Sequence, residues 1–148
     1  MYHERIALST VSPQAVKIII ELDDVLQQET LIDDRLRELV RIRVSQINGC
    51  AYFLGRRSKE LLRLGDTQER LHQLAGWRDS RLFSATERAA LALAESMTWL
   101  QSEGVSDEEY GEAERLLGPY NLGNLIMTIS LCNALDRMCL TARLHPPS

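Results

Sequence analysis

Apolar residues recur at steps of three and four along almost the whole chain, and this periodicity constrains the fold more than any other feature. In one segment the residues that share a helix face are Leu36, Leu39, Val40 and Val44. No stretch alternates apolar and polar residues for long enough to predict a strand. The pattern therefore predicts an all-α fold.

Capping residues and helix breakers divide the chain into about six to seven helices. Ser84 with Glu87 three residues later is a capping box, and Gly118-Pro119 is typical of a helix end. Further caps are expected at Ser12, Asp66 and Ser106. The expected helices span residues 12–28, 33–48, 51–64, 66–75, 84–103, 106–117 and 121–143. Because 148 residues with 45% hydrophobic side chains suffice for one core, we expect a single domain over 1–148.

The charge pattern argues against nucleic acid as a partner. The net charge is -4, and acidic and basic residues are interspersed, so no broad positive surface is available for phosphates. The one cluster of basic residues comprises Arg35, Arg37, Arg41 and Arg43, with Glu38 among them. We expect this cluster to be a solvated or subunit-facing helix surface.

The uncharged run from 116 to 135 is not expected to span a membrane. It contains Gly118, Pro119 and several asparagines, which hydrocarbon would penalise, so a buried core helix fits better. The opening residues show no secretory signal, and three cysteines without metal-ligand spacing suggest neither a disulfide framework nor a metal site. We therefore expect a cytoplasmic protein without a metal or cofactor.

Cys50 is the first candidate for chemistry because it follows Asn48-Gly49 at an expected helix start. Unpaired backbone N–H groups and the helix dipole there favour a thiolate, and Arg57 lies two turns along the same face. The alternative is that Cys50 is a small buried apolar residue. Cys132 and Cys139 are seven residues apart on an apolar helix, where core packing is the expected role. Three histidines far from Cys50 suggest neither a ligand set nor a triad.

The residues around Cys50 resemble a known family. The runs ELVRIRVSQINGCAYF, RLGDTQERLHQLAGWRDSRLFSATERAALALAE and YNLGNLIMTISLCNALDR are similar to the carboxymuconolactone decarboxylase superfamily, in its AhpD-like alkylhydroperoxidase branch. The resemblance implies an all-α fold that assembles into homo-oligomers, often trimers or hexamers. It also implies a glutamate, a Cys-x-x-Cys pair and a histidine four residues later. Glu38 matches the glutamate, Cys50 matches the first cysteine, and Tyr52 stands where some members place a proton-relay histidine.

Two motif positions depart from the family pattern. Phe53 replaces the second cysteine and Arg57 replaces the histidine, so the usual two-cysteine cycle is not available within the motif. One hypothesis is a thiol-dependent peroxidase of the peroxiredoxin type that acts through Cys50, Glu38, Tyr52 and Arg57 on a small peroxide with a thiol reductant. Cys132 or Cys139 would resolve the oxidised thiol if the fold brings one close. The alternatives are a non-redox decarboxylase-like enzyme and a catalytically inactive oligomeric binding protein.

Overall fold

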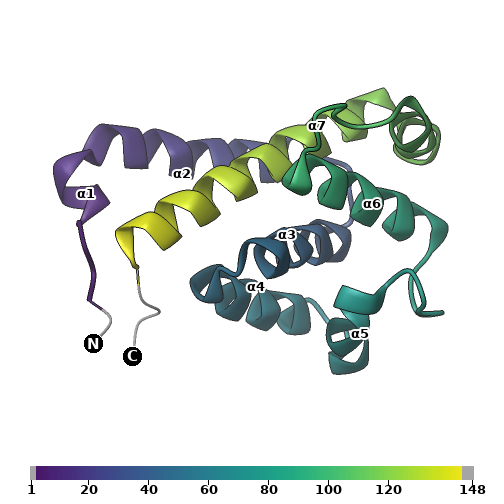
Figure 1. Ribbon diagram of the computed structural model, residues 1–148, viewed down its shortest axis with the longest axis horizontal. Helices are drawn as coiled ribbons and strands as arrows, with labels where there is room; N and C mark the ends of the chain where they lie inside the picture. Colours follow the sequence, from purple (N-terminus) through teal and green to yellow (C-terminus); the bar gives the residue numbers. More distant parts are fainter. Residues whose placement is uncertain (1–2, 145–148) are drawn as a thin grey trace.

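The structure, a computed structural model, describes residues 3–144 and confirms the all-α prediction. No strand occurs among these residues (Figure 1). The elements are α1 (Leu8–Val11), α2 (Pro13–Gln28), α3 (Asp34–Asn48), α4 (Ala51–Arg63), α5 (Gln68–Gln73), the 3-10 turn η1 (Leu74–Gly76), α6 (Ala85–Trp99) and α7 (Asp107–Ala142). They form a single helical bundle around one core.

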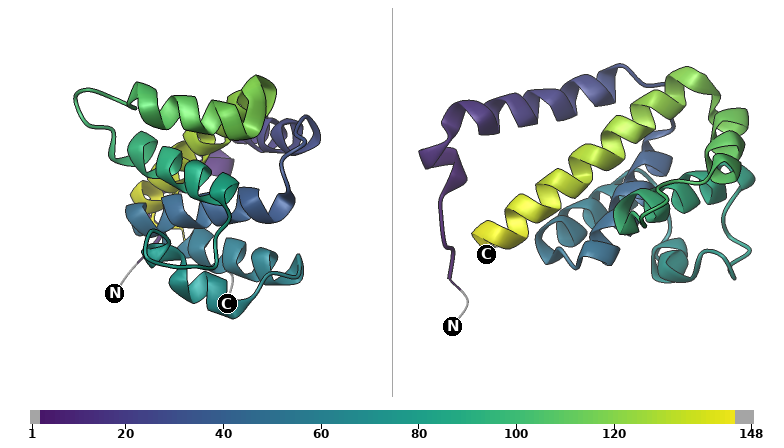
Figure 2. Two further views of the ribbon diagram at one scale, coloured as in Figure 1. Left: turned by 90° about the vertical axis from the view of Figure 1, so that its right-hand side faces the viewer. Right: turned by 45° about the horizontal axis from the view of Figure 1, so that its top comes forward.

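Helices α3 and α7 lie at the centre of the bundle and pack against each other, with α6 packed on both and α4 packed on α3 (Figures 1 and 2). The fully buried side chains come mostly from these two helices and from α6. They include Leu39, Ile42, Leu91, Leu125 and Ile129. The arginine cluster is not the solvated or subunit-facing surface that was expected, because Arg37, Glu38 and Arg41 of α3 are buried within the chain beside the core.

The helix end predicted at Gly118-Pro119 is confirmed: Gly118 is non-helical, and α7 consists of two helical segments that meet at a kink there. Gly118 has a φ of 78°, which a residue with a Cβ adopts only with strain, and the helical hydrogen bonding resumes beyond it. Pro119 fits the first turn after the kink, where a missing N–H costs nothing. The two helices predicted for 106–117 and 121–143 are therefore two arms of α7.

Other helix ends agree with the predictions to within a few residues. The capping box of Ser84 and Glu87 is present, whereas Thr67, not Asp66, accepts the capping bond of α5. Ser12 precedes α2 but makes no side-chain capping bond. Helix α6 ends at Trp99, earlier than the predicted 103, and the short α1 is an addition to the predicted helices.

Helix α7 is long and apolar enough, by length and composition, to cross a membrane. The core helix of a globular protein has the same properties, and here Leu122, Leu125 and Ile129 are buried against α3 and α6. Its buried face also carries Asn124, Thr128, Asn133 and Asp136. This polar content matches the expectation of a core helix.

Helix α2 lies on the outside of the bundle and buries little. It packs beside α7, and Leu26 is its one buried residue. The segment before it is tied to the end of α7 by a hydrogen bond of 2.8 Å from the Arg5 N–H to the Ala142 carbonyl. Figure 2 shows α1 and this segment projecting from the rest of the molecule. Ile18, Ile20 and Val25 are exposed on α2.

Candidate functional site

Cys50 sits where α3 ends and α4 begins. Gly49 ends α3 with a left-handed φ of 72°, and the Cys50 N–H then donates to the Ser45 carbonyl at 3.0 Å. Cys50 is the N-cap residue of α4, and its carbonyl accepts the first bond of that helix from Leu54 at 3.0 Å. The Cys50 side chain is 0% exposed. The Asn-Gly pair thus sets the turn and places the thiol in the interior.

The thiol of Cys50 contacts two side chains of α7, Asp136 and Cys139. Burial raises the pKa of Cys50 most strongly, the backbone N–H of Phe53 lowers it, and the Asp136 charge raises it further. Burial also raises the pKa of Cys139 to about 12, with a hydrogen bond to Cys50 as the next cause. The net effect on Cys50 is opposite in direction to that expected from a helix start alone.

The Asp136 carboxylate binds several of the polar side chains near Cys50. Its carboxylate is fully buried and accepts hydrogen bonds from the Ser45 hydroxyl at 3.0 Å and from Asn48 Nδ2 at 3.0 Å. Arg57 Nη1 forms an ion pair with it at 3.8 Å. We call these residues, together with the three cysteines, the Asp136 network. Hydrogen bonds and one cation therefore compensate the cost of burying this charge.

Arg57 is buried in the Asp136 network, but its hydrogen bonds do not go to Cys50. Its Nη1 donates to Ser45 Oγ at 2.8 Å and to Cys132 Sγ at 2.6 Å. The guanidinium also lies 4.4 Å from the centre of the Phe53 ring. Burial raises the pKa of Cys132 to about 11, while the Arg57 charge acts in the opposite direction. Arg57 thus holds Cys132 and Asp136 in place.

Glu38 lies in the N-terminal part of α3 and is buried. Its Oε1 accepts from Arg41 Nη1 at 3.2 Å, and Arg41 also pairs with Asp23 at 3.1 Å. Burial raises the pKa of Glu38, and the charges of Arg41 and Arg57 lower it less. Glu38 Oε2 is buried without a hydrogen-bond partner, as are Arg57 Nε and Nη2. Glu38 therefore interacts with the Asp136 network through the Arg57 charge.

Tyr52 lies on the outer side of α4. Its hydroxyl accepts a hydrogen bond of 3.3 Å from Arg56 Nη1, and its ring meets Phe53 edge-on at 5.0 Å. The structure thus brings Cys50 and Arg57 into one network, with Glu38 beside it, and leaves Tyr52 without a hydrogen bond to that network.

Sequence reasoning did not single out three residues of this site, Ser45, Asn48 and Asp136, and it named Cys139 only as one of two possible partners of Cys50. Two patterns in the sequence point to Asp136 and to Cys139. Asp136 is the first charge after the uncharged run 116–135, which marks a charge entering the core. Cys139 follows it at a spacing of three, which places both on one helix face.

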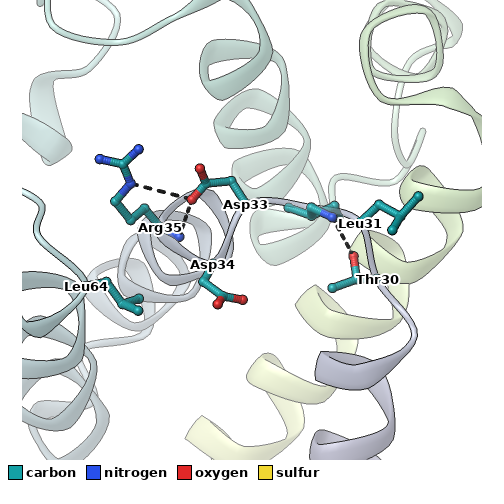
Figure 3. A pocket seen from close by; sticks show the side chains of 7 residues that line it. Thr30, Leu31, Asp33, Asp34, Arg35 and Leu64 are labelled. Atoms are coloured by element: carbon teal, nitrogen blue, oxygen red, sulfur yellow. Dashed lines mark hydrogen bonds and ion pairs between the residues drawn. The ribbon is translucent and has the colours of Figure 1, made fainter.

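Two surface hollows have linings that do not include Cys50. One of about 500 Å³ is formed by the link between α2 and α3 (Figure 3). A neighbouring one of about 470 Å³ includes Arg70 and Glu87, which pair with each other. Within residues 3–144 no group of three or more His, Cys, Asp or Glu side chains is placed to hold a metal ion.

Comparisons with known proteins agree with this architecture. Residues 13–96 match the model of the carboxymuconolactone decarboxylase family. The uncharacterized protein YdfG of Bacillus subtilis is 29% identical over 137 residues, which cover 93% of this chain and 92% of YdfG.

Solved structures add to the comparison. ATU0492 of Agrobacterium tumefaciens, a protein of unknown function proposed as the antioxidant defence protein AhpD, superposes with a TM-score of 0.92 at 25% identity, over 99% of both chains. A variant of the debrominase Bmp8 in complex with 2,3,4-tribromopyrrole shares the fold at 18% identity, with a TM-score of 0.81 over 93% of this chain and 73% of that one. The chain belongs to the carboxymuconolactone decarboxylase family, in its AhpD-like branch.

Proposed function

We propose that this protein is a thiol-dependent peroxidase in which Cys50 is the reacting sulfur and Asp136 accepts its proton. The observation that carries the proposal is the contact between the Cys50 thiol and the buried Asp136 carboxylate. A carboxylate beside the thiol supplies the base that Arg57, always protonated, cannot supply at the position of the family histidine. The likeness to ATU0492 over nearly the whole chain supports the same class of activity.

The proposed reaction balances with one peroxide and two reducing equivalents. Asp136 takes the thiol proton as Cys50 Sγ attacks one peroxide oxygen, so the S–O bond forms while the O–O bond breaks. The departing oxygen takes up a proton and leaves as an alcohol, or as water when the substrate is hydrogen peroxide. Cys50 becomes a sulfenic acid, and two thiol groups of the reductant return it to the thiol, releasing water and becoming a disulfide.

The neighbouring residues have positioning roles in this proposal. Arg57 pairs with Asp136 and holds its carboxylate next to Cys50. Glu38, whose pKa burial raises, balances the Arg57 charge from the other side. Tyr52 lies outside the hydrogen-bonded network, and we assign it no step.

The test is peroxide-dependent consumption of a dithiol by purified protein. We expect hydrogen peroxide or cumene hydroperoxide to be reduced in the presence of dithiothreitol by the wild type and not by Cys50→Ser. Cys132→Ser is the matched control, because Cys132 is buried on the same helix as Cys139 but is bound by Arg57. Equal rates for the wild type and Cys50→Ser would exclude the proposal.

A non-redox, decarboxylase-like activity is a second candidate. The observation that favours it is the pair of buried groups with unused hydrogen-bonding atoms, Glu38 Oε2 and Arg57 Nε and Nη2. An acid with a raised pKa beside a guanidinium suits acid–base chemistry on a small carboxylate. Turnover of small lactones or keto acids that persists in Cys50→Ser and disappears in Glu38→Gln would favour this candidate over the peroxidase.

A catalytically inactive binding protein is the third candidate, and the burial of Cys50 with its raised pKa favours it. It predicts no turnover of the peroxides and none of the small lactones or keto acids. The peroxidase proposal additionally implies a compartment where thiols stay reduced, so we propose the cytoplasm as its location.

A further inference from the structure

We propose that Cys50 and Cys139 form a reversible disulfide, so that Cys139 on α7 takes the part of the second motif cysteine that Phe53 replaces. The peroxide-driven half of this inference rests on the proposed function. The pairing itself rests on the contact between the two thiols and is independent of which oxidant acts.

The fold brings together two cysteines that are far apart in the sequence. Cys50 opens α4, and Cys139 lies in the last turn of α7, one turn beyond Asp136. Ser45 and Asn48, just before Cys50, donate hydrogen bonds to Asp136 at 3.0 Å, which holds the turn at Cys50 against the last turns of α7. Both cysteines are buried and free, and each thiol influences the pKa of the other. Two neighbouring thiols held in this way need little backbone movement to reach disulfide geometry.

The third cysteine has other partners. Cys132 lies two turns earlier on α7, accepts a hydrogen bond from Arg57 Nη1 and approaches the Arg41 carbonyl at 3.6 Å. These bonds direct its sulfur toward α3 and the Arg57 side of the network. Cys139 is therefore the resolving partner that the geometry favours over Cys132.

The position of Cys139 near a helix end makes the exchange accessible. Helix α7 ends at Ala142, where the Arg5 N–H donates to the Ala142 carbonyl at 2.8 Å and the N–H groups of Arg143 and Leu144 donate to the Cys139 carbonyl. Last turns of helices open at lower free-energy cost than the core, so this end can admit a peroxide and later a dithiol to two otherwise buried sulfurs.

The chemistry balances without a cofactor. After Cys50 is oxidised to the sulfenic acid, the Cys139 thiol attacks its sulfur, the S–S bond forms, and the hydroxyl leaves as water with the Cys139 proton. An external dithiol then reduces the disulfide by two successive exchanges and is itself oxidised to a disulfide. Each cycle consumes one peroxide and one dithiol.

Trypsin separates the three cysteines, which makes the pairing directly measurable. Cleavage after Arg43, Arg56, Arg115, Arg137 and Arg143 leaves Cys50 in peptide 44–56, Cys132 in 116–137 and Cys139 in 138–143. The reduced full-length protein is treated with diamide or with hydrogen peroxide, its remaining thiols are blocked, and the linked peptides are identified by mass spectrometry.

We expect both oxidants to link 44–56 to 138–143, a link that dithiothreitol reverses and Cys132→Ser retains. With peroxide, Cys139→Ser leaves Cys50 as a sulfenic acid that dimedone traps. A link formed with diamide but not with peroxide upholds the pairing and removes the peroxidase proposal. A dominant link from Cys50 to Cys132, or no link in natively folded protein with either oxidant, overturns the pairing.

Discussion

Cys50 occupies a helix N-cap, where backbone N–H groups stabilise a thiolate, yet its side chain is fully buried beside a carboxylate. Desolvation and the Asp136 charge disfavour the thiolate, and together they exceed the contribution of the Phe53 N–H, so the pKa of Cys50 is raised. The thiol is therefore protonated near neutrality. A reaction at this sulfur needs a base in contact with it, which is the role proposed for Asp136.

Replacing Asp136 by Asn tests this balance because it should change two rates in opposite directions. Removing the negative charge should lower the pKa of Cys50 and speed its alkylation by iodoacetamide near pH 8, about tenfold for every pH unit by which the pKa falls. Peroxide reduction should slow, because the proton acceptor is lost. Asp107→Asn, at the exposed start of the same helix, is the control and should change neither rate. A parallel fall in both rates would indicate a structural defect instead.

The buried Cys132 thiol should make the folded protein less stable at alkaline pH. Its pKa is raised from 9.0 to about 11, so between these values the unfolded chain has lost a proton that the folded chain keeps. The free energy of unfolding should therefore fall as pH rises through this window, by up to about 1.4 kcal/mol per pH unit for this thiol. In urea unfolding under reducing conditions, the free energy of unfolding of Cys132→Ser should fall less steeply with pH than that of the wild type. The control Met127→Leu should keep the slope of the wild type. Equal slopes for the wild type and Cys132→Ser would contradict the prediction.

At the scale of the helices, a buried ionic cluster at Glu95 fixes the positions of neighbouring helices relative to one another. Glu95 on α6 is buried and accepts from Trp77 Nε1 at 2.7 Å, from Arg78 Nη1 at 2.5 Å and from Arg43 Nε at 3.3 Å. One carboxylate thus joins α3, the segment after η1, and α6. With every partner in place, its burial costs little.

Truncating Glu95 to Ala should destabilise the fold strongly because it removes the acceptor of Trp77 Nε1 and of Arg43 Nε, both of which it binds inside the protein. We expect a loss of about 3 kcal/mol in the free energy of unfolding, measured by urea denaturation. Glu112→Ala is the matched control, since Glu112 pairs with Arg115 on the fully exposed face of α7 and should contribute far less. Similar losses in both variants would show that the Glu95 cluster does not connect the helices as argued.

The sequence predicts where the helices begin and end, but not which side chains of different helices contact one another. Capping residues and periodicity identify α3, α4 and the start of α6 almost to the residue, because those interactions are local. The break at Gly118 is also predicted from the sequence, because the preference of glycine for a positive φ and the missing N–H of Pro119 are local properties. The contacts of Asp136 with Ser45 and Asn48 span about ninety positions, and only the packing of α3 on α7 creates them.

At the scale of the whole molecule, the N-terminal helices α1 and α2 expose apolar side chains that no other part of the same chain within residues 3–144 covers. Helix α2 leaves Ile18 61%, Ile20 57% and Val25 42% exposed, and α1 contacts mainly α2. Apolar groups gathered on one projecting unit are typical of surfaces that another chain covers. We propose that a second copy of this chain covers them, in keeping with the trimers or hexamers that the family resemblance implies.

Light scattering after size-exclusion chromatography tests this assembly. The wild type should elute with a molar mass of three or six times the 16.8 kDa chain, and Ile18→Glu should shift it toward a single chain because a carboxylate would be buried between copies. Lys17→Glu is the matched control, since Lys17 is its exposed neighbour on the same helix and already carries a charge. Circular dichroism should report the same helicity for both variants, so that a change in mass reflects the interface and not unfolding. A wild type with the mass of one chain at micromolar concentration would exclude the assembly, and the exposed isoleucines would then face solvent.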